Sequence, residues 1–242
     1  MPVSLSGQVA VIVGASSGVG RAAAVLFARE GVKVVASARR EDRLQSLKDE
    51  LAREQHDITV CRADASKVED MQQLAQATLE KFGRIDILVF AGGTNTPDRA
   101  MERLTPEIWN SLIDTNLNGA FYATHVILPS MRKAGSGHLI YVSSISGLLP
   151  DVSGAAYQAS KRGVLALAHA IRMEEKQNGI RTCAICPGLI NTELLEKRPV
   201  KPSPEVLAKA LQAEDVAEVI LFVAKLPAHA SVPEMQVMPT FQ

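Results

Sequence analysis

Tyr157 and Lys161 lie four residues apart in a segment whose residues predict a long helix. On a helix, this spacing brings two side chains to one face, about 5–6 Å apart. A free tyrosine has a pKa near 10 and exchanges protons poorly at neutral pH. One cation about 4 Å away stabilises its phenolate by about 4 kcal/mol, or about 3 pKa units. The pair is therefore predicted to act as a general acid or base. The alternative is a surface pair without function, as an isolated pair with this spacing usually is.

The elements that would position this pair begin with a glycine-rich turn. Residues 8–13 are apolar and β-branched and predict a buried strand, and residues 18–30 predict a helix that ends at Gly31. A glycine-rich turn between strand and helix lets backbone N–H groups approach a pyrophosphate. The glycines are spaced more widely than in the Gly-x-Gly-x-x-Gly pattern, so the alternative is a tight turn that binds nothing. A second strand–helix unit follows in the sequence and favours cofactor binding. The candidate cofactor-binding residues of this turn are Gly14, Ser16, Ser17, Gly18, Val19 and Gly20.

Two arginines, Arg39 and Arg40, follow the second predicted strand, residues 32–37. In dinucleotide-binding folds an acidic residue near the end of this strand binds the ribose 2′-hydroxyl of NAD. Arginines in its place suit a 2′-phosphate. We therefore expect NADP, with NAD less favoured, with Arg39 as the first ligand and Arg40 as its helper. In the alternative, both arginines are solvated and pair with Glu41 and Asp42.

Five motifs in a fixed order make the sequence resemble the short-chain dehydrogenase/reductase family along essentially its whole length. They are Gly14–Gly20, Asp114–Leu117, Ser143–Ser144, Tyr157 with Lys161, and Pro187–Thr192. The resemblance implies an oxidoreductase that transfers hydride between a nicotinamide and a small-molecule carbonyl or secondary alcohol, with no metal. Two positions depart from the family pattern: Val13 replaces a threonine, and Phe90 replaces an asparagine that braces a loop. We expect altered loop packing there, and an effect on cofactor affinity.

The resemblance also implies roles for individual residues. Tyr157 would be the general acid in carbonyl reduction and the base in alcohol oxidation, and Ser144 would hydrogen-bond the substrate oxygen. Ser144 fits the family's serine-to-tyrosine spacing better than Ser143. Lys161 would lower the pKa of Tyr157 and bind the nicotinamide ribose, and Asn116 would hold a water that links Lys161 to solvent. The remaining implied cofactor contacts are Asp64 at the adenine, Ala91, Gly92 and Gly93 along the cofactor, Pro187 and Gly188 beside the nicotinamide, Ile190 at the carboxamide, and Thr192 at the pyrophosphate.

Strands and helices alternate along the chain. Predicted strands cover residues 8–13, 32–37, 58–62, 85–90, 137–143, 180–186 and about 234–238. Predicted helices cover residues 18–30, 41–55, 67–81, 105–114, 116–133, 155–177, 204–211 and 214–225. This pattern predicts an α/β fold: one doubly wound Rossmann-type domain over residues 1–242, with a seven-stranded parallel sheet and helices on both faces. The helices over 116–133 and 155–177 are apolar on more than one face. Together with the resemblance, this favours a homodimer or homotetramer over packing against loops of the same chain.

Composition narrows the partners. The 242 residues carry 26 basic and 26 acidic side chains, a net charge of zero that favours neither nucleic acid nor an anionic membrane. No apolar stretch reaches about 18 residues and the N-terminus lacks a signal pattern, so we expect a cytoplasmic location. Cys183 and Cys186 have the spacing of half a metal site, but residues three apart on a strand face opposite sides. Buried structural thiols are therefore predicted.

The substrate pocket is predicted less closely. Residues 193–204 contain several prolines, which predict an extended segment placed to act as a substrate lid. Its basic residues, Lys197, Arg198 and Lys201, suit an acidic substrate, although a solvated loop is favoured. A mainly apolar wall is expected from Leu148, Leu149, Val152, Leu189, Leu194 and Leu195.

Two other functions agree with parts of the sequence. Residues 14–18 fit the Gly-x-Ser-x-Gly turn that carries the nucleophile of a hydrolase, here Ser16. A hydrolase of this kind needs an earlier strand to supply its oxyanion loop, and none precedes residue 8. The second alternative is an NADP-binding sensor without turnover, against which the complete catalytic set argues.

Overall fold

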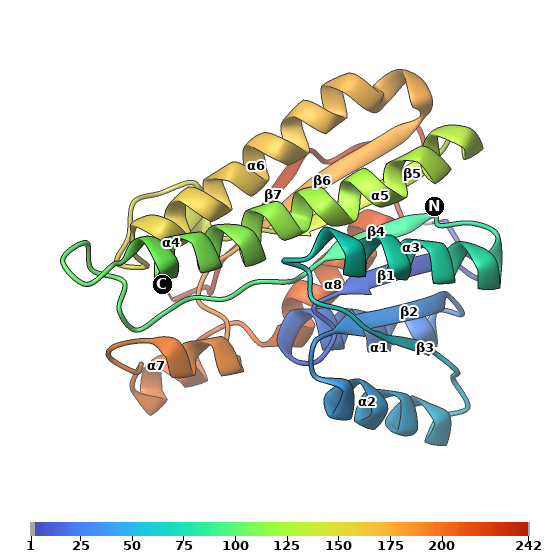
Figure 1. Ribbon diagram of the computed structural model, residues 1–242. Helices are drawn as coiled ribbons and strands as arrows, with labels where there is room; N and C mark the ends of the chain where they lie inside the picture. Colours follow the sequence, from blue (N-terminus) through green and yellow to red (C-terminus); the bar gives the residue numbers. More distant parts are fainter. Residues whose placement is uncertain (1–2, 242) are drawn as a thin grey trace.

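One sheet of seven parallel strands runs through the computed structural model, which describes residues 3–241 (Figure 1). The strands lie in the order β3-β2-β1-β4-β5-β6-β7. Their bounds are β1 Val9–Val13, β2 Lys33–Ala38, β3 Thr59–Arg62, β4 Ile87–Phe90, β5 Gly137–Val142, β6 Ile180–Pro187 and β7 Glu234–Val237. The predicted seven-stranded parallel sheet is confirmed.

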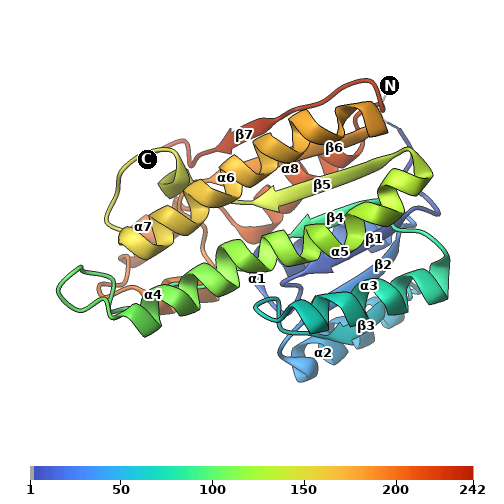
Figure 2. The same cartoon turned by 45° about the horizontal axis from the view of Figure 1, so that its top comes forward.

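Helices cover both faces of this sheet (Figure 2). Helices α1, α2 and α8 supply buried residues to one face, and α3, α5 and α6 supply them to the other. The bounds are α1 Gly18–Arg29, α2 Glu41–Arg53, α3 Val68–Phe82, α4 Pro106–Ile113, α5 Gly119–Ala134, α6 Ala155–Glu175, α7 Pro204–Ala208 and α8 Ala213–Ala224. The doubly wound arrangement is therefore as predicted. Among residues 3–241, no helix combines the length and the apolarity needed to span a bilayer.

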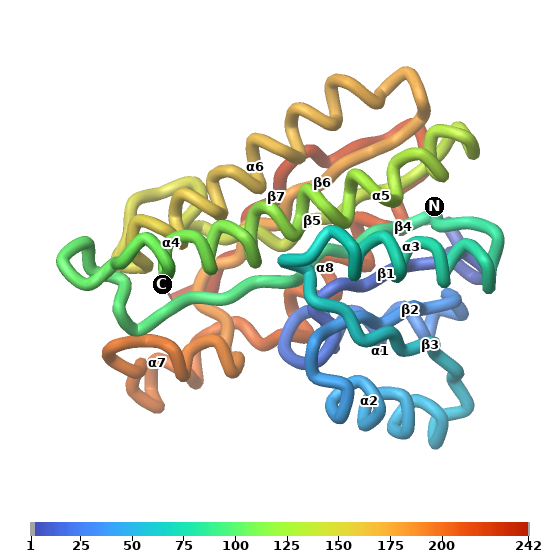
Figure 3. The backbone as a smooth tube through the Cα atoms, in the orientation of Figure 1, coloured from blue at the N-terminus to red at the C-terminus, as the bar shows by residue number. Residues whose placement is uncertain are grey.

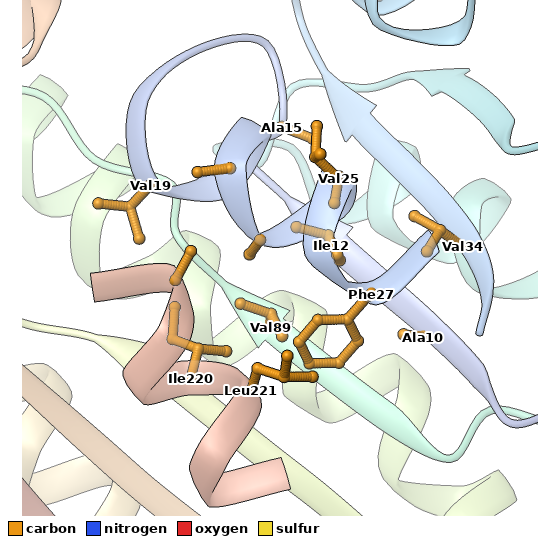
Figure 4. Packing of buried hydrophobic residues seen from close by; sticks show 14 of the residues in the cluster. Ala10, Ile12, Ala15, Val19, Val25, Phe27, Val34, Val89, Ile220 and Leu221 are labelled. Atoms are coloured by element: carbon orange, nitrogen blue, oxygen red, sulfur yellow. The ribbon is translucent and has the colours of Figure 1, made fainter. Parts of the chain in front are cut away.

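The core follows from the alternation of side chains along β1. Ala10 and Ile12 face the side covered by α1 and α8, where Phe27 packs with them (Figure 4). Val11 and Val13 belong to the cluster on the opposite side. Successive residues of a strand point to opposite faces, so a strand covered on both sides needs an unbroken apolar run. That requirement explains why this strand is recognisable from sequence.

The order of the strands places a ligand site at one edge of the sheet. Strands β2 and β4 lie on either side of β1, so the order reverses there. Ligands of such sheets bind outside the carboxyl ends of the strands at this point. The segments that follow β4, β5 and β6 all leave the sheet at this edge, toward the left in Figure 3. Most of the predicted catalytic and cofactor residues lie in these segments or at the end of β1.

Two helix boundaries differ from the prediction by three residues each, and the others by at most two. The helix expected to begin at residue 116 begins at Gly119 as α5. A π-helical turn, Asp114–Asn118, comes before it and joins α4 to α5. Such turns are rare and often lie at functional sites, and a hydrophobic pattern of period 3.6 does not reveal them. The helix expected over 204–211 ends at Ala208. Leu211 instead forms a β-bridge with Ile190, which fixes the chain just after β6.

Candidate active site

Tyr157 and Lys161 lie on the first two turns of α6 and line the same cleft. Their exposed fractions are 8% and 4%. The Lys161 Nζ lies 5.7 Å from the centre of the Tyr157 ring. It donates a hydrogen bond of 3.0 Å to the carbonyl of Val142, the last residue of β5. The helix thus brings the two side chains together, and the bond to β5 holds the ammonium at the carboxyl edge of the sheet.

Burial dominates the electrostatics of both side chains. It raises the pKa of Tyr157, and a hydrogen bond with the Ser144 side chain opposes this rise. Burial also lowers the pKa of Lys161 to about 8. The net lowering of the Tyr157 pKa expected from the neighbouring ammonium is not observed, because desolvation of the phenolate outweighs the nearby charges. A phenol with a raised pKa is protonated at neutral pH, which is the form that a general acid requires.

Ser144, two residues after β5, is the serine that contacts Tyr157. Its own side chain is nearly buried, with an exposed fraction of 8%. Ser143 instead donates a hydrogen bond of 2.9 Å to the backbone carbonyl of Lys161. The geometry therefore agrees with the choice of Ser144 over Ser143 as the residue next to the reacting group.

A chain of hydrogen bonds leads from Ser144 to a carboxylate that the sequence analysis missed. The Ser144 Oγ donates to the Ser146 Oγ at 3.2 Å, and Ser146 donates to the Asp151 Oδ2 at 2.5 Å. Ser153 donates to the same carboxylate through its backbone N–H at 2.8 Å and its hydroxyl at 3.0 Å. The Asp-x-Ser spacing favours a local turn of this kind and is the signal that identifies the carboxylate from sequence.

Asn116 lies in the π-helical turn and is fully buried. Its Oδ1 accepts a hydrogen bond of 2.7 Å from the Thr94 N–H, and its Nδ2 donates to the Thr94 carbonyl at 3.0 Å. Its Nδ2 also donates to the Ser160 Oγ at 3.0 Å. Asn116 therefore braces the segment after β4 against α6, and the water that the resemblance implies at this residue stays a prediction.

Phe90, the departure at the end of β4, fills space beneath the cofactor cleft. Its exposed fraction is 1%. A Cβ added to Gly92 would lie 3.1 Å from the Phe90 Cζ, and one added to Gly119 would lie 3.2 Å from it. The ring therefore packs against two glycines, Gly92 and Gly119.

The glycine-rich turn is held by close backbone contacts. Gly14 has a φ of +91°, and a Cβ there would lie 2.7 Å from the Gly92 N. A Cβ on Gly20 would lie 2.4 Å from the Gly14 carbonyl oxygen. A Cβ on Gly18, where φ is +53°, would lie 3.3 Å from the Thr192 Cγ2. Side chains are thus excluded from a cradle formed by the segments after β1, β4 and β6, as close approach of a pyrophosphate requires.

The two arginines after β2 have different partners. Arg40 donates to the Ser17 Oγ at 2.7 Å and pairs with Glu193 at 2.8 Å. Arg39 lines the cleft and forms no hydrogen bond or ion pair within residues 3–241, although its charge helps lower the pKa of Asp64. Both arginines are exposed, but in the described chain neither forms an ion pair with the acids that open α2, so the pairing suggested in the alternative is not observed. Arg39 is left available to a phosphate.

Most predicted site residues line one cleft of about 470 Å³ at the carboxyl edge of the sheet. Gly20 and Asn116 do not: Gly20 supports the turn through its backbone, and Asn116 lies behind the cleft wall. A glycine cradle, a free arginine and the Tyr–Lys pair in a single cleft fit a nicotinamide dinucleotide. The predicted residues that line it are Gly14, Ser16, Ser17, Gly18, Val19, Arg39, Arg40, Asp64, Ala91, Gly92, Gly93, Ser144, Tyr157, Lys161, Pro187, Gly188, Ile190 and Thr192.

The predicted apolar wall is only half correct. Leu189, Leu194 and Leu195 line the cleft, whereas the expected residues of the loop after β5 do not. In that loop Leu149 is 58% exposed and Val152 is 84% exposed. The hydrogen bonds of Asp151 turn the loop so that its polar residues face inward. The cleft is therefore lined by polar and charged side chains that the sequence analysis did not assign: Asn95, Arg99, Ser146, Asp151 and Ser153.

The cysteine pair behaves as predicted from the strand alternation. Cys183 and Cys186 are buried, and they belong to the clusters on opposite faces of the sheet. Burial raises the pKa of each thiol to about 12. Both thiols are therefore protonated and unreactive at neutral pH. Residues 3–241 contain no group of three or more His, Cys, Asp or Glu side chains arranged to hold a metal ion.

Comparisons with known proteins agree with this geometry. A family model described as short chain dehydrogenase matches residues 8–202. An uncharacterized oxidoreductase of Staphylococcus aureus (strain MRSA252) is 33% identical over 235 residues, which cover 97% of this chain and 98% of that protein. The solved closed form of serine dehydrogenase complexed with NADP+ has a TM-score of 0.88 and 30% identity, covering 97% of this chain and 96% of that one. A solved metagenomic short-chain oxidoreductase in complex with NADP has a TM-score of 0.85 and 30% identity, and the match covers 99% of this chain and 100% of that one.

The doubly wound sheet, with a dinucleotide cleft and a Tyr–Lys pair at its carboxyl edge, defines the class of Rossmann-type oxidoreductases. Within that class, the chain belongs to the short-chain dehydrogenase/reductase family.

Proposed function

We propose that this protein is an NADP(H)-dependent oxidoreductase that interconverts a small-molecule carbonyl compound and the corresponding secondary alcohol, with Tyr157 as the general acid or base. The observation that carries the proposal is that Tyr157 and Ser144 line the same cleft as the glycine-rich turn, where the Ser144 side chain opposes the rise of the Tyr157 pKa. Two hydroxyl groups that line one cleft beside each other are able to donate to one substrate oxygen.

The residues perform the reduction as follows. The Ser144 hydroxyl turns its single O–H from Ser146 to the substrate carbonyl oxygen, and Tyr157 donates a second hydrogen bond to the same oxygen. The nicotinamide cofactor, when bound, supplies the hydride that the carbonyl carbon accepts. The two donors stabilise the negative charge where it develops on the oxygen, and Tyr157 gives its proton to complete the alcohol. Lys161, 5.7 Å from the ring centre, stabilises the phenolate that remains. In the oxidising direction, the Tyr157 phenolate accepts the hydroxyl proton.

The cofactor would be held along the whole cleft. The glycine-rich turn and Thr192 would bind the pyrophosphate, Asp64 the adenine edge, and Lys161 the nicotinamide ribose. We propose NADP over NAD because Arg39 is an unpaired cation at the end of β2. Two similar solved structures also contain NADP, which supports this choice.

The test is a panel of small ketones, aldehydes and secondary alcohols assayed with NADPH, NADP⁺ and the NAD forms. We expect turnover of at least one substrate pair, with a preference for the phosphorylated cofactor. The Tyr157→Phe variant serves as the control, because it keeps the ring and removes the proton. Tight NADPH binding without turnover across the panel would instead indicate a sensor that binds the cofactor without catalysis.

We also propose that two or four copies of the chain associate through α5 and α6, in the cytoplasm. On α5, Phe121 is 46% exposed and its ring stacks on His125 with 5.5 Å between ring centres. On α6, Met173 is 52% exposed. Burying such side chains against a second copy removes apolar surface from water, which favours association. Light scattering during size-exclusion chromatography measures the number of copies directly, and a mass of one chain would reject the proposal.

A further inference from the structure

Arg99 is fixed beside the start of the helix that carries Tyr157. A Cβ added to Gly154, the residue before α6, would lie 2.6 Å from the Arg99 Cβ and 2.8 Å from its carbonyl oxygen. Gly154 has a φ of +91°, which glycine adopts without strain. On the same segment, the buried Asn95 side chain donates a hydrogen bond of 3.2 Å to the Ser153 carbonyl. The backbone of Arg99 is therefore held one helical turn from Tyr157, in the wall of the cleft.

The Arg99 guanidinium carries a charge that no acidic side chain of residues 3–241 neutralises by an ion pair. Its Nε donates to the Thr96 carbonyl at 3.0 Å, and its Nη2 donates to the Lys197 carbonyl at 2.7 Å. Both acceptors are neutral, and these bonds use two of the five N–H donors of the group. Burial lowers the pKa of Arg99, as expected for a cation that has lost water without gaining a counterion.

Lys197 and Arg198 bring two more positive charges to this wall. The Lys197 Nζ donates to the Thr94 Oγ1 at 2.5 Å, and the Arg198 side chain forms no hydrogen bond or ion pair in the described part of the chain. The charge of Arg198 acts against that of Arg99, so the two guanidinium groups lie within each other's field. Asp151 also lines the wall, but its carboxylate already accepts three hydrogen bonds from its own loop. The wall therefore carries an excess of positive charge next to the reacting group.

We infer that this wall binds a carboxylate of the substrate, so that the enzyme acts on small hydroxy acids and oxo acids. The inference rests on the proposed function, because it places the reacting oxygen at Ser144 and Tyr157. A carboxylate matches the planar fork of an arginine and gains charge-assisted hydrogen bonds. It also relieves the mutual repulsion of Arg99 and Arg198, which are partly buried and which a neutral substrate would leave without a counterion. In this proposal Lys197 and Arg198 would have the substrate as a partner, whereas a solvated loop is the expectation favoured from the sequence.

The position of Arg99 sets the size of the substrate. The charge of Arg99 acts on Tyr157 and that of Tyr157 acts on Arg99, so the guanidinium lies within the electrostatic field of the reacting group. The acid should therefore be short, with only a few carbons between the carboxylate and the reacting carbon. The phosphates of the cofactor are the other anions that the Arg99 guanidinium could bind. The glycine-rich turn and Arg39 are expected to bind those phosphates, so Arg99 variants should weaken binding of the acid and not of NADPH.

Binding without turnover provides the direct test. A hydroxy acid titrated into the NADPH-loaded enzyme cannot react, because both are already reduced. Calorimetry would compare lactate, 3-hydroxybutanoate and 4-hydroxybutanoate with their methyl esters. We expect at least one acid to bind about 10-fold or more tightly than its ester. Arg99→Leu should weaken that acid by about 10- to 150-fold, the range for losing hydrogen bonds to a charged group, and should leave the ester and NADPH unchanged. Arg99→Lys should lose less affinity for the acid, because lysine keeps the positive charge but lacks the paired N–H donors of the guanidinium.

Arg103→Leu is the matched control. Arg103 lies on the same segment, pairs with Asp98 at 3.6 Å and does not line the cleft, so its loss should not change binding of the acid. Equal binding of acid and ester, or no binding of any acid, would overturn the inference. An Arg99→Leu variant that weakens acid and ester alike would overturn it too, and would assign Arg99 to holding the loop. Weakened NADPH binding would assign the cation to the cofactor. Reduction of a neutral ketone in any of these cases would leave the proposed function intact.

Discussion

The Arg40 guanidinium and the Glu193 carboxylate form an ion pair, with 2.8 Å between Nη1 and Oε2. This pair ties the end of β2 to the first residue of the segment 193–204. Hydrogen bonding to Arg40 holds the pKa of the Glu193 carboxyl below its usual value, with the charge of Arg43 helping at 3.6 Å. The arginine expected to help bind a 2′-phosphate is thus already paired with an acid of the segment 193–204. A phosphate that binds there must compete with Glu193.

Replacing Glu193 with glutamine should therefore favour the phosphorylated cofactor. The pair is about half exposed, and exposed ion pairs are worth about 0.2–1 kcal/mol. We expect Glu193→Gln to tighten NADPH binding by about 1.5- to 5-fold and to leave NADH unchanged, as measured by fluorescence titration. Glu196→Gln is the control, because Glu196 lies in the same segment and pairs with Lys201 instead. Equal tightening of both cofactors would show that Glu193 does not compete with the phosphate.

Arg39 should decide between the two cofactors. It lines the cleft, and no acidic side chain of the described chain pairs with it. Charge-assisted hydrogen bonds are worth about 1.5–3 kcal/mol, so Arg39→Asp should weaken NADPH binding by about 10- to 150-fold. NADH binding should stay the same or improve, because an acid at this position suits a ribose hydroxyl. Equal losses for both cofactors in the same titration would assign Arg39 a structural role, and a wild-type preference for NADH would reject the assignment.

The segment 193–204 should become more ordered when ligands bind. It spans the cleft through contacts on both sides: Glu193 with Arg40, and Lys197 with Thr94. Cofactor and a verified substrate together should slow amide hydrogen exchange in this segment. Exchange in residues 54–58, between α2 and β3 and outside the cleft lining, should not change. If the segment exchanges at the same rate with and without saturating ligands, it does not act as a lid.

The fold and the catalytic pair follow from the sequence because their signals are local and periodic. The apolar run of β1 predicts a strand covered on both faces, and the four-residue spacing of Tyr157 and Lys161 is preserved by any regular helix. The glycines of the turn near residue 14 are recognisable for a similar reason. At Gly14 and Gly20 backbone contacts exclude a side chain, and at Gly18 a positive φ disfavours one.

The substrate wall is not predictable in the same way. Arg99 lies in an irregular segment, and its place beside α6 depends on the contact with Gly154, which no local pattern encodes. The loop after β5 was expected to turn its leucines inward. Hydrogen bonds to Asp151 turn it the other way and leave Leu149 largely exposed. A prediction from hydrophobicity alone therefore places the wrong side of this loop against the cleft. The hydrogen bonds that the Asp151 carboxylate accepts determine the orientation of the loop instead.

Ser144 and Asp151 should move the pKa of Tyr157 in opposite directions. Burial is the main cause of its raised pKa. The hydrogen bond from Ser144 lowers it, and the negative charge of Asp151 raises it further. Carbonyl reduction needs the protonated phenol, so kcat/KM should stay level at neutral pH and fall as pH rises through this pKa. Alcohol oxidation needs the phenolate and should rise over the same range.

The measurement is kcat/KM for reduction against pH, in wild type and three variants that circular dichroism shows to be folded. Ser144→Ala should slow turnover and move the falling limb to higher pH, because the stabilising hydrogen bond to the phenolate is lost. Asp151→Asn keeps the shape of the side chain, removes the opposing charge and should move the limb to lower pH. Tyr157→Phe should reduce turnover by about 10²- to 10⁴-fold while NADPH still binds, because the proton donor is lost and the ring is kept. A folded Tyr157→Phe enzyme with nearly full turnover would defeat the mechanism. If the falling limb moves in the same direction in Ser144→Ala and in Asp151→Asn, one of these two side chains does not affect the Tyr157 pKa as expected.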